Sequence, residues 1–355
     1  MRRWPAWRAA AGLSAVAVAG FGGGLWLSGA GVPPAFATPA RAPALCEDYG
    51  GLPPEAQTPH AGMVRLPGGR MTMGSDVHYA EEARTHEVTL DGFWIDRHDV
   101  TNAQFARFVE ATGYLTVAER MPDLARHPDL PPAMRVPGSA VFIMPAAGRQ
   151  GHWRYVAGAN WRHPEGPGSD IRQRANHPVV HVAYEDALAY ARWLGRELPT
   201  EAQWEYAARG GLEGATYVWG NEFAPKGQAM ANTWEGPFPM LNTGADGYAG
   251  TAPVGCFAPN GFGLYDMAGN VWQWTATWYR PAHPAGARHN PAGPAERDSI
   301  DPRQPGVPAK VIKGGSHLCS ADYCMRYRPA ARQARETDSG TSHIGFRTVV
   351  NLSSS

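Results

Sequence analysis

Glycine and proline interrupt this chain so often that they leave little room for long helices. The sequence has 42 glycines and 32 prolines among 355 residues, and both residue types favour turns over the interior of helices and strands. The 13 tryptophans supply large side chains that can fix loops by packing against them. These features predict a loop-rich fold that is pinned by aromatic side chains.

The charges of the chain are balanced. Lysine and arginine together number 32, and so do aspartate and glutamate. A balanced charge creates no overall field that would attract nucleic acid or an anionic membrane surface. We therefore expect no nucleic-acid partner.

The N-terminal segment, residues 1–37, is typical of a secretory signal peptide. Three arginines precede an apolar run, and the sequence Ala-Phe-Ala at 35–37 forms a small-x-small cleavage site. Because the apolar run is slightly long, an uncleaved membrane anchor is the alternative. We expect an exported protein, periplasmic or secreted, that contacts a membrane only if this segment stays attached. Residues 38–60 are rich in Pro, Ala and Gly and read as a linker, which leaves 61–352 as the folded domain.

The first part of that domain carries clear strand and helix signals. Residues 63–66 and 70–73 flank Pro-Gly-Gly and are predicted to form a hairpin, and further strands are expected at 88–90 and 93–95. Capping boxes predict helices that run from Thr101 to Gly113 and from Thr200 to Gly210. An amphipathic pattern predicts a helix at 183–194. After residue 212 we expect only short strands and long loops.

Two of the four cysteines, Cys319 and Cys324, lie close together in the segment KGGSHLCSADYCMRYRPAAR. Thiolates prefer Cu(I), zinc or iron–sulfur centres, but two alone cannot complete a four-ligand zinc site. Neighbouring arginines should lower the pKa of the thiols. A low-coordinate metal site, a redox couple and a plain disulfide remain open. Cys46 and Cys256 could also pair, but spacing does not fix connectivity.

This segment, together with DSGTSHIGFR, resembles the C-terminal signature of the formylglycine-generating enzymes. These sulfatase-modifying oxidases convert a sulfatase cysteine into Cα-formylglycine. The resemblance covers most of residues 62–350 and implies an α+β, C-type-lectin-like fold with little regular secondary structure. LPTEAQWEYAARGG and GLYDMAGNVWQWT mark the wider superfamily, so they indicate the fold and not the reaction. Non-catalytic relatives lack the cysteine pair, which makes the pair the most specific part.

The resemblance implies copper- and O2-dependent oxidation of the cysteine in a CxPxR motif of an unfolded sulfatase. Cys319 and Cys324 would hold Cu(I), Cys324 would act more directly on the substrate thiol, and Ser316 would lie beside the oxygen site. The residues implied for substrate binding are Asp123, Trp161, Arg162, Trp272, Arg332 and His343. Each also has a structural interpretation, because buried tryptophans and loop carboxylates are common in any fold.

Two structural calcium sites are also implied. The first would use Asn232, Thr233, Asp246 and Tyr248, with Thr233 and Tyr248 binding through their carbonyl groups, since Ca²⁺ prefers oxygen ligands. The second would use Asp266, Gly269, Val271 and Gln273. Gln273 stands where the family usually has glutamate, and the lost charge should weaken that site, although Asp266, at a position where the family often has asparagine, can compensate for it.

Three other functions share this scaffold. The first is an exported, non-catalytic binding protein, against which the cysteine pair argues. The second is a sulfoxide synthase acting on histidine betaines, which needs an additional helical domain that this chain has no room for. The third is an exported oxidase that modifies a siderophore chromophore, but relatives of that class lack the paired cysteines.

Overall fold

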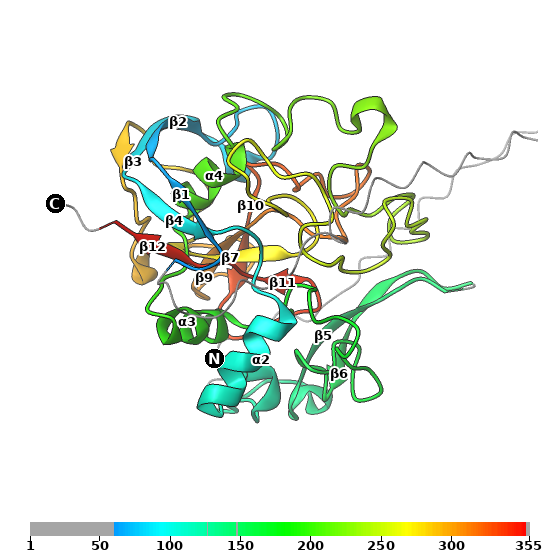
Figure 1. Cartoon of the computed structure of the whole chain (residues 1–355). Coiled ribbons are helices and arrows are strands. Elements are labelled where there is room, and N and C mark those ends of the chain that lie inside the picture. The colour runs from blue at the N-terminus through cyan, green and yellow to red at the C-terminus, as the bar shows by residue number, and fades with distance from the viewer. Residues whose placement is uncertain (1–59, 126, 147, 353–355) are drawn as a thin grey trace, which may run out of the picture.

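The computed structural model describes residues 60–125, 127–146 and 148–352. Within them the chain forms three α-helices, twelve short strands and several turns of 3-10 helix, joined by long loops (Figure 1). The longest helix has 11 residues and the longest strand has 7. The expected loop-rich α+β architecture is therefore confirmed.

The strands form four small sheets. The first has the order β1 (Met63–Leu66), β4 (Phe93–Asp96), β12 (Val349–Asn351), and the second has the order β2 (Gly69–Met73), β3 (His86–Leu90), β8 (Arg288–His289). The third has the order β10 (Arg332–Glu336), β9 (Ala309–Lys313), β7 (Trp272–Trp278), β11 (Ile344–Gly345), and the fourth pairs β5 (Gly138–Ile143) with β6 (His152–Ala157). The first sheet thus joins the two ends of the described chain.

The three helices begin and end close to the predicted residues. They are α2 (Asn102–Thr112), α3 (Tyr184–Trp193) and α4 (Glu201–Arg209). Thr101 and Thr200 cap α2 and α4 with the expected capping boxes, and left-handed Gly113 and Gly210 end them. Shorter 3-10 turns are η1 (Ala80–Glu82), η2 (Val117–Glu119), η3 (Pro132–Met134), η4 (Pro225–Gly227) and η5 (Glu296–Asp298).

The predicted hairpin of residues 63–73 is wrong, although both of its strands exist. β1 pairs with β4, and β2 pairs with β3, so the two strands enter different sheets. The reason lies at Gly68, whose φ of +77° turns the chain, and whose carbonyl accepts a hydrogen bond from the Tyr206 hydroxyl of α4. Only glycine fits there, because a Cβ would lie 2.4 Å from the carbonyl oxygen of Leu90.

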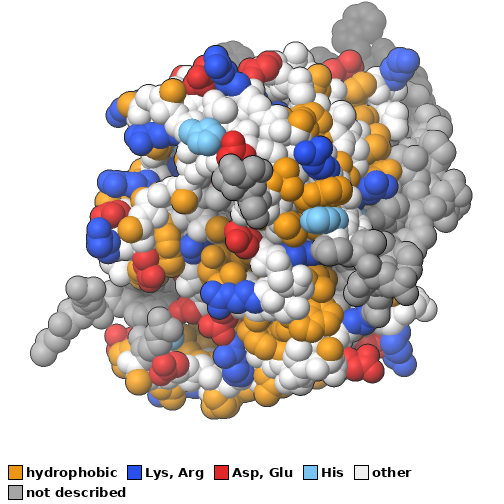
Figure 2. Space-filling model, turned by 60° about the vertical axis from the view of Figure 1, so that its left-hand side comes forward, with side chains coloured by type: hydrophobic (Ala, Val, Ile, Leu, Met, Phe, Trp, Pro, Cys, Tyr) orange, Lys and Arg blue, Asp and Glu red, His pale blue; other side chains and the backbone are white. Residues whose placement is uncertain are grey.

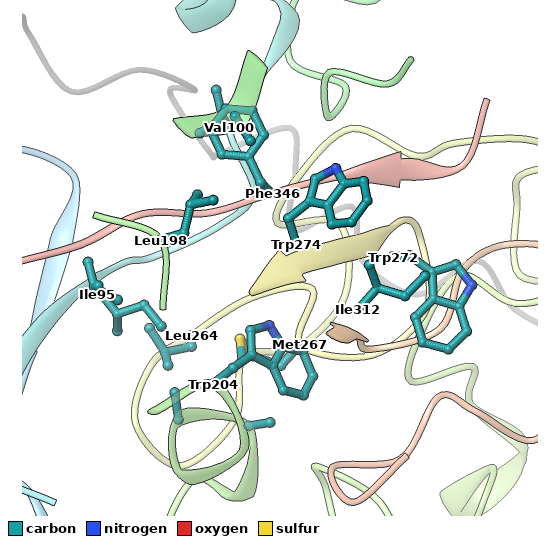
Figure 3. Packing of buried hydrophobic residues seen from close by; sticks show 14 of the residues in the cluster. Ile95, Val100, Leu198, Trp204, Leu264, Met267, Trp272, Trp274, Ile312 and Phe346 are labelled. Carbon is teal, nitrogen blue, oxygen red and sulfur yellow. The ribbon is translucent and has the colours of Figure 1, made fainter. Parts of the chain in front are cut away.

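The hydrophobic core lies between α4, β7 and β4 (Figure 3). Trp204 of α4 and Trp274 of β7 are fully buried, and Trp272 is 2 % exposed, as expected for tryptophans that pin a loop-rich fold. Ile95 of the first sheet and Phe346 of the loop after β11 complete this cluster. The outer surface in Figure 2 carries basic and acidic side chains interspersed with apolar ones.

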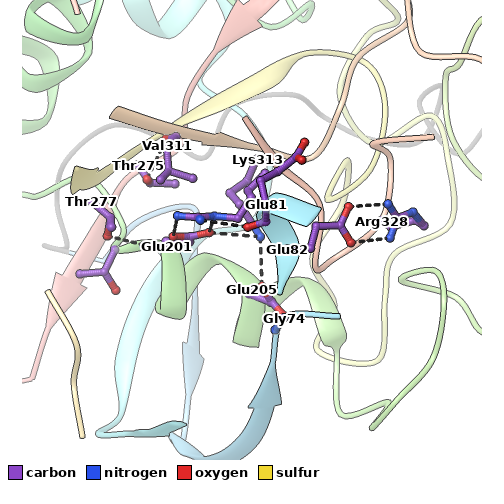
Figure 4. Close-up of polar contacts among 12 residues, drawn as sticks. Gly74, Glu81, Glu82, Glu201, Glu205, Thr275, Thr277, Val311, Lys313 and Arg328 are labelled. Carbon is purple, nitrogen blue, oxygen red and sulfur yellow. Dashed lines mark hydrogen bonds and ion pairs between the residues drawn. The ribbon is translucent and has the colours of Figure 1, made fainter. Parts of the chain in front are cut away.

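A buried ionic network crosses this core where β9 ends (Figure 4). Glu205 of α4 accepts hydrogen bonds from Lys313 at 3.0 Å, Arg209 at 2.7 Å and the Gly74 amide at 2.8 Å. Although burial opposes ionisation, Lys313 and Arg209 lower the pKa of Glu205 to about 2. Since Lys313 is the last residue of β9, the network fixes the point from which the cysteine segment departs.

No helix in the described part of the chain is long and apolar enough to cross a membrane. The predicted signal peptide or anchor at 1–37 lies outside the described residues, as does the predicted linker at 38–60 except for its last residue.

Candidate active site

The cysteine segment is a tight loop that follows β9. Gly315 has a φ of +70°, and a Cβ on it would lie 2.9 Å from the backbone of Arg326 and Tyr327. The two arms of the loop therefore lie in direct contact. Inside it, the Cys319 amide donates to the Ser316 carbonyl and the Cys324 amide donates to the Ser320 carbonyl, each at 2.9 Å. These turns bring the two cysteines face to face.

Cys319 and Cys324 are free thiols whose sulfur atoms lie 2.9 Å apart. Cys319 is 2 % exposed and Cys324 is 9 % exposed. Burial and the hydrogen bond to Cys324 raise the pKa of Cys319 well above its usual value. The same hydrogen bond, with help from Arg326 and against burial, lowers the pKa of Cys324 to about 6. Cys324 is thus the more accessible and more easily ionised thiol of the pair.

Arg326 supplies a fixed positive charge beside Cys324. Its guanidinium lies 4.0 Å from the Cys324 sulfur and also pairs with Glu81. The same group stacks over the Tyr79 ring, 4.0 Å from its centre, and the Tyr79 hydroxyl accepts a hydrogen bond from the Met325 amide. Sequence analysis missed Tyr79 and Glu81, because they lie far from the cysteines along the chain and belong to no local motif.

Arg328 holds the base of the loop from the same side. Its two terminal nitrogens donate to both carboxylate oxygens of Glu82, at 2.8 and 2.5 Å (Figure 4), and its Nε donates to the Met325 carbonyl. Two-point arginine–carboxylate pairs define orientation as well as charge. Glu81 and Glu82 of η1 thus act together on the cysteine loop.

The opposite side of the loop rests on the segment around Trp234. The Trp234 amide donates to the Cys319 carbonyl at 2.9 Å. Its ring packs with Phe142 and Phe238, and Leu318 joins this cluster. Phe238 in turn stacks on Tyr323, with ring centres 4.3 Å apart, and Tyr323 is 66 % exposed. The residue that precedes Cys324 in the chain therefore carries an exposed aromatic ring.

The donor set of the pair fits a soft, low-coordinate metal ion. Among the described residues no group of three or more His, Cys, Asp or Glu side chains could hold a metal ion, so the two thiols stand without a third ligand of that kind. Two thiolates satisfy Cu(I) but leave zinc two ligands short. Cys319 and Cys324 would be the residues that hold copper.

The other predicted active-site residues occupy different surroundings. Ser316 is fully buried next to the pair, and its hydroxyl accepts a hydrogen bond from the Leu318 amide at 3.2 Å. Trp272 donates its amide to the His343 carbonyl. The His343 ring packs on Trp153 and contacts the Thr341 hydroxyl, and its pKa is lowered by burial.

Trp161 and Arg332 are committed to the interior of the protein. Trp161 packs edge-on against Phe105 in the core. Arg332 is 2 % exposed and donates to both oxygens of Glu201, at 2.6 and 2.9 Å, and to two backbone carbonyls. These contacts give both residues a structural role.

Arg162 and Asp123 lie nearer the surface. Arg162 stacks over the Trp161 ring at 4.1 Å and pairs with Glu119 at 2.6 Å. Asp123 is exposed in the loop after η2, where one carboxylate oxygen accepts the Ala125 amide.

The first calcium group comes together in space. Asp246 accepts hydrogen bonds from the amides of Thr233 and Tyr248, at 2.9 and 3.0 Å. The side-chain oxygen of Asn232 is buried and has no hydrogen-bond partner in the described structure, which is costly unless a cation or water binds it. Burial raises the pKa of Asp246 to about 7, a penalty that a bound cation would remove. These residues fit Ca²⁺.

In the second calcium group the Gln273 side chain offers no open oxygen. Gln273 accepts hydrogen bonds from Trp204 and Arg347 and donates its amide to the Asp266 carbonyl. Cys256 is disulfide-bonded, and Cys46, with which the sequence left its pairing open, lies outside the described residues.

Comparison with known proteins assigns this chain to a family. A family model described as sulfatase-modifying factor enzyme 1-like domain matches residues 49–352. This chain belongs to the sulfatase-modifying factor family. The formylglycine-generating enzyme of Mycobacterium tuberculosis (strain ATCC 25618 / H37Rv) is 53% identical over 298 residues, which cover 81% of this chain and 97% of that protein.

Other members of the sulfatase-modifying factor family differ in activity. The inactive C-alpha-formylglycine-generating enzyme 2 of Mus musculus is 38% identical over 313 residues, covering 83% of this chain and 88% of that protein. Among solved structures, PvdO from Pseudomonas aeruginosa has a TM-score of 0.54 and 25% identity, covering 82% of this chain and 94% of that one. The family and fold expected from the sequence are confirmed, and the question of activity turns on the site.

Proposed function

We propose that residues 61–352 form a formylglycine-generating oxidase. In this reaction the cysteine side chain of a CxPxR motif in an unfolded sulfatase loses its sulfur as sulfide and becomes an aldehyde. O2 is the oxidant and is reduced to water, and a thiol reductant supplies the two further electrons that this reduction needs. Similarity to a formylglycine-generating enzyme at 53% identity supports the substrate class. The observation that carries the proposal for this chain is the pair of free, buried thiols 2.9 Å apart.

We infer a copper requirement, which the donor set supports. Cys319 and Cys324 would hold Cu(I), which when bound supplies the centre at which O2 is activated. The protein contributes position, charge and a dry surrounding. Arg326 favours the thiolate form of Cys324 near neutral pH, and the burial of both thiols excludes water.

The substrate peptide would approach from the side of Cys324. Cys319 is 2 % exposed, whereas Cys324 is 9 % exposed and directly follows the exposed Tyr323 in the chain. An exposed carboxylate such as Asp123 suits the arginine of CxPxR, because carboxylates bind guanidinium groups through two hydrogen bonds. Ser316, Trp272 and His343 remain candidates for the pocket itself, with Arg162 at its periphery. Trp161 and Arg332 make scaffold contacts, and a role for them in substrate binding stays a prediction.

Calcium at the first group would support this site through the backbone. Asn232 and Thr233 directly precede Trp234, whose amide holds the Cys319 carbonyl at 2.9 Å. An ion on Asn232 and Asp246 would therefore stabilise the segment on which the cysteine loop rests.

We propose that the protein is exported and that residues 1–37 are removed, with membrane attachment only if they are not. N-terminal sequencing of the mature protein should begin near Thr38. Recovery of the full-length chain from the cytosol would contradict export without affecting the proposed reaction.

The activity is tested by incubating the protein with a CxPxR peptide, O2 and a thiol reductant, with and without Cu(I). Mass spectrometry should show loss of the thiol and gain of an aldehyde that hydrazide traps, and only the copper-loaded protein should produce it. An inactive binding protein, as the similarity to an inactive relative allows, would bind the peptide and leave its mass unchanged.

A further inference from the structure

Gln273 of β7 connects four parts of the chain through one side-chain amide. Its oxygen accepts a hydrogen bond from the Trp204 indole at 2.7 Å and from Arg347 Nε at 2.8 Å. Its nitrogen donates to the Asp266 carbonyl at 2.8 Å. The side chain is fully buried. The resemblance to the family places a second calcium ion among Asp266, Gly269, Val271 and this residue.

The orientation of the Gln273 amide is determined by its partners. The indole and guanidinium groups can only donate, and the backbone carbonyl can only accept. If the amide were inverted, its NH2 group would face two N–H donors and its oxygen would face a carbonyl oxygen. The nitrogen must therefore point at Asp266, so an N–H group occupies the direction in which a metal ligand would need to present an oxygen.

The Asp266 carbonyl has no lone pair left for a cation. Besides Gln273 it accepts a second hydrogen bond, from Arg347 Nη2 at 3.2 Å, and a carbonyl oxygen has two lone pairs. Arg347 also brings a positive charge to the same oxygen. The same guanidinium offsets the charge of the Asp266 carboxylate, whose Oδ2 accepts the Gly255 amide at 2.8 Å. Arg347 is fully buried, so water does not screen its repulsion of a divalent cation, and the Asp99 carboxylate at 3.3 Å balances only part of its charge.

We propose that the Gln273 amide takes the place of a calcium ion, so that this chain binds structural calcium at the Asn232–Asp246 group and not at the Asp266–Gln273 group. The hydrogen bond from Gln273 holds the Asp266 carbonyl against β7, as an ion bridging two oxygens would. The loop stays fixed without metal. This inference is independent of the proposed oxidase activity.

A glutamate at this position would restore the need for an ion. One of its oxygens could keep the hydrogen bonds from Trp204 and Arg347, but the other would face the Asp266 carbonyl at the distance of a hydrogen bond. Two oxygens held that close repel each other unless a cation lies between them. Gln273→Glu should therefore create a calcium site, and Gln333→Glu, on the partly exposed part of β10, is the matched control.

The test is the number of calcium ions per chain after dialysis against roughly 1 mM Ca²⁺, a concentration that fills weak extracellular sites, measured by elemental analysis. We expect one ion in the wild-type chain and in Gln333→Glu, none in Asp246→Ala, and two in Gln273→Glu. Chelation should lower the melting temperature of Gln273→Glu by more than that of Gln333→Glu.

Two ions in the wild-type chain would overturn the proposal, as would one ion retained by Asp246→Ala. A folded Gln273→Glu protein that binds no more calcium than the wild type would do the same. If Gln273→Glu folds only in the presence of calcium, that dependence supports the proposal. If it does not fold at all, the counts for the wild type and Asp246→Ala decide.

Discussion

Arg328 and Glu82 lie 246 residues apart in the sequence, yet they form a two-point ion pair whose side chains are 1 % and 0 % exposed. The pair fastens the base of the cysteine loop to η1. The neighbouring pair of Arg326 and Glu81 lies nearer the thiols and is about one-fifth exposed at each side chain. Through Glu82, η1 thus holds the base of the cysteine loop, and through Glu81 it pairs with the arginine beside Cys324.

Breaking the buried pair should be costly. Glu82→Gln leaves the Arg328 charge without a counter-charge in the interior, which typically costs about 3–5 kcal/mol. The free energy of unfolding in urea measures this loss. Glu81→Gln is the control, since a more exposed pair contributes about 1 kcal/mol or less. If both variants lost the same free energy of unfolding, the buried pair would not be the more costly one to break.

Arg326 should control the ionisation of Cys324. Arg326→Met removes a positive charge 4.0 Å from the sulfur, so the pKa of Cys324 should rise from about 6 toward that of an ordinary thiol. Ultraviolet titration of thiolate in the metal-free protein would report the shift. Arg297→Met, at an exposed arginine, should leave the titration unchanged. An unaltered Cys324 titration in Arg326→Met would show that Cys319 alone sets the pKa.

The Glu205 network predicts a loss of stability in acid. The pKa of Glu205 is about 2 in the folded protein, below its usual value of about 4.3 when unfolded. Its contribution is therefore present above the unfolded pKa and disappears as the pH falls from about 4.3 toward 2. Urea unfolding across this range should give a shallower pH dependence for Glu205→Gln than for the wild type. Parallel curves would exclude Glu205 as a source of the acid sensitivity.

Calcium should stabilise the segment beneath Cys319. Asp246 supplies the negative charge of the first calcium group, and the Asn232 amide cannot replace it. Asp246→Ala should lower the melting temperature, and chelation should then have little further effect. Because the pKa of Asp246 is about 7 without metal, calcium affinity of the wild type should weaken as the pH falls below 7. Equal calcium-dependent melting shifts in the variant and the wild type would remove Asp246 from the site.

Local sequence signals predicted the elements whose causes are local. Thr101 and Thr200 begin helices because each caps its own first turn, and the tryptophans of α4 and β7 are buried as their size suggests. The hairpin of β1 and β2 failed because strand pairing depends on Tyr206 and on distant partners. The cysteine pair was found from its motif. Tyr79, Glu81 and Glu82 were missed, because only the folded chain brings η1 to the thiols.

The central claim is that Cys319 and Cys324 act as a unit in forming the aldehyde. A two-thiolate site loses Cu(I) when either thiol is removed, and residues that act together give non-additive losses. If the pair served as a plain disulfide, the variants would lose roughly 2–4 kcal/mol of stability and still turn over. Melting curves recorded beside the assay separate these cases.

The most direct measurement is aldehyde yield on a CxPxR peptide at matched copper for Cys319→Ser, Cys324→Ser and the double variant. The account predicts that each single variant stays folded and loses nearly all turnover, and that the double variant is about as inactive as either. Full activity in folded Cys324→Ser would contradict it and would favour a binding role for the chain.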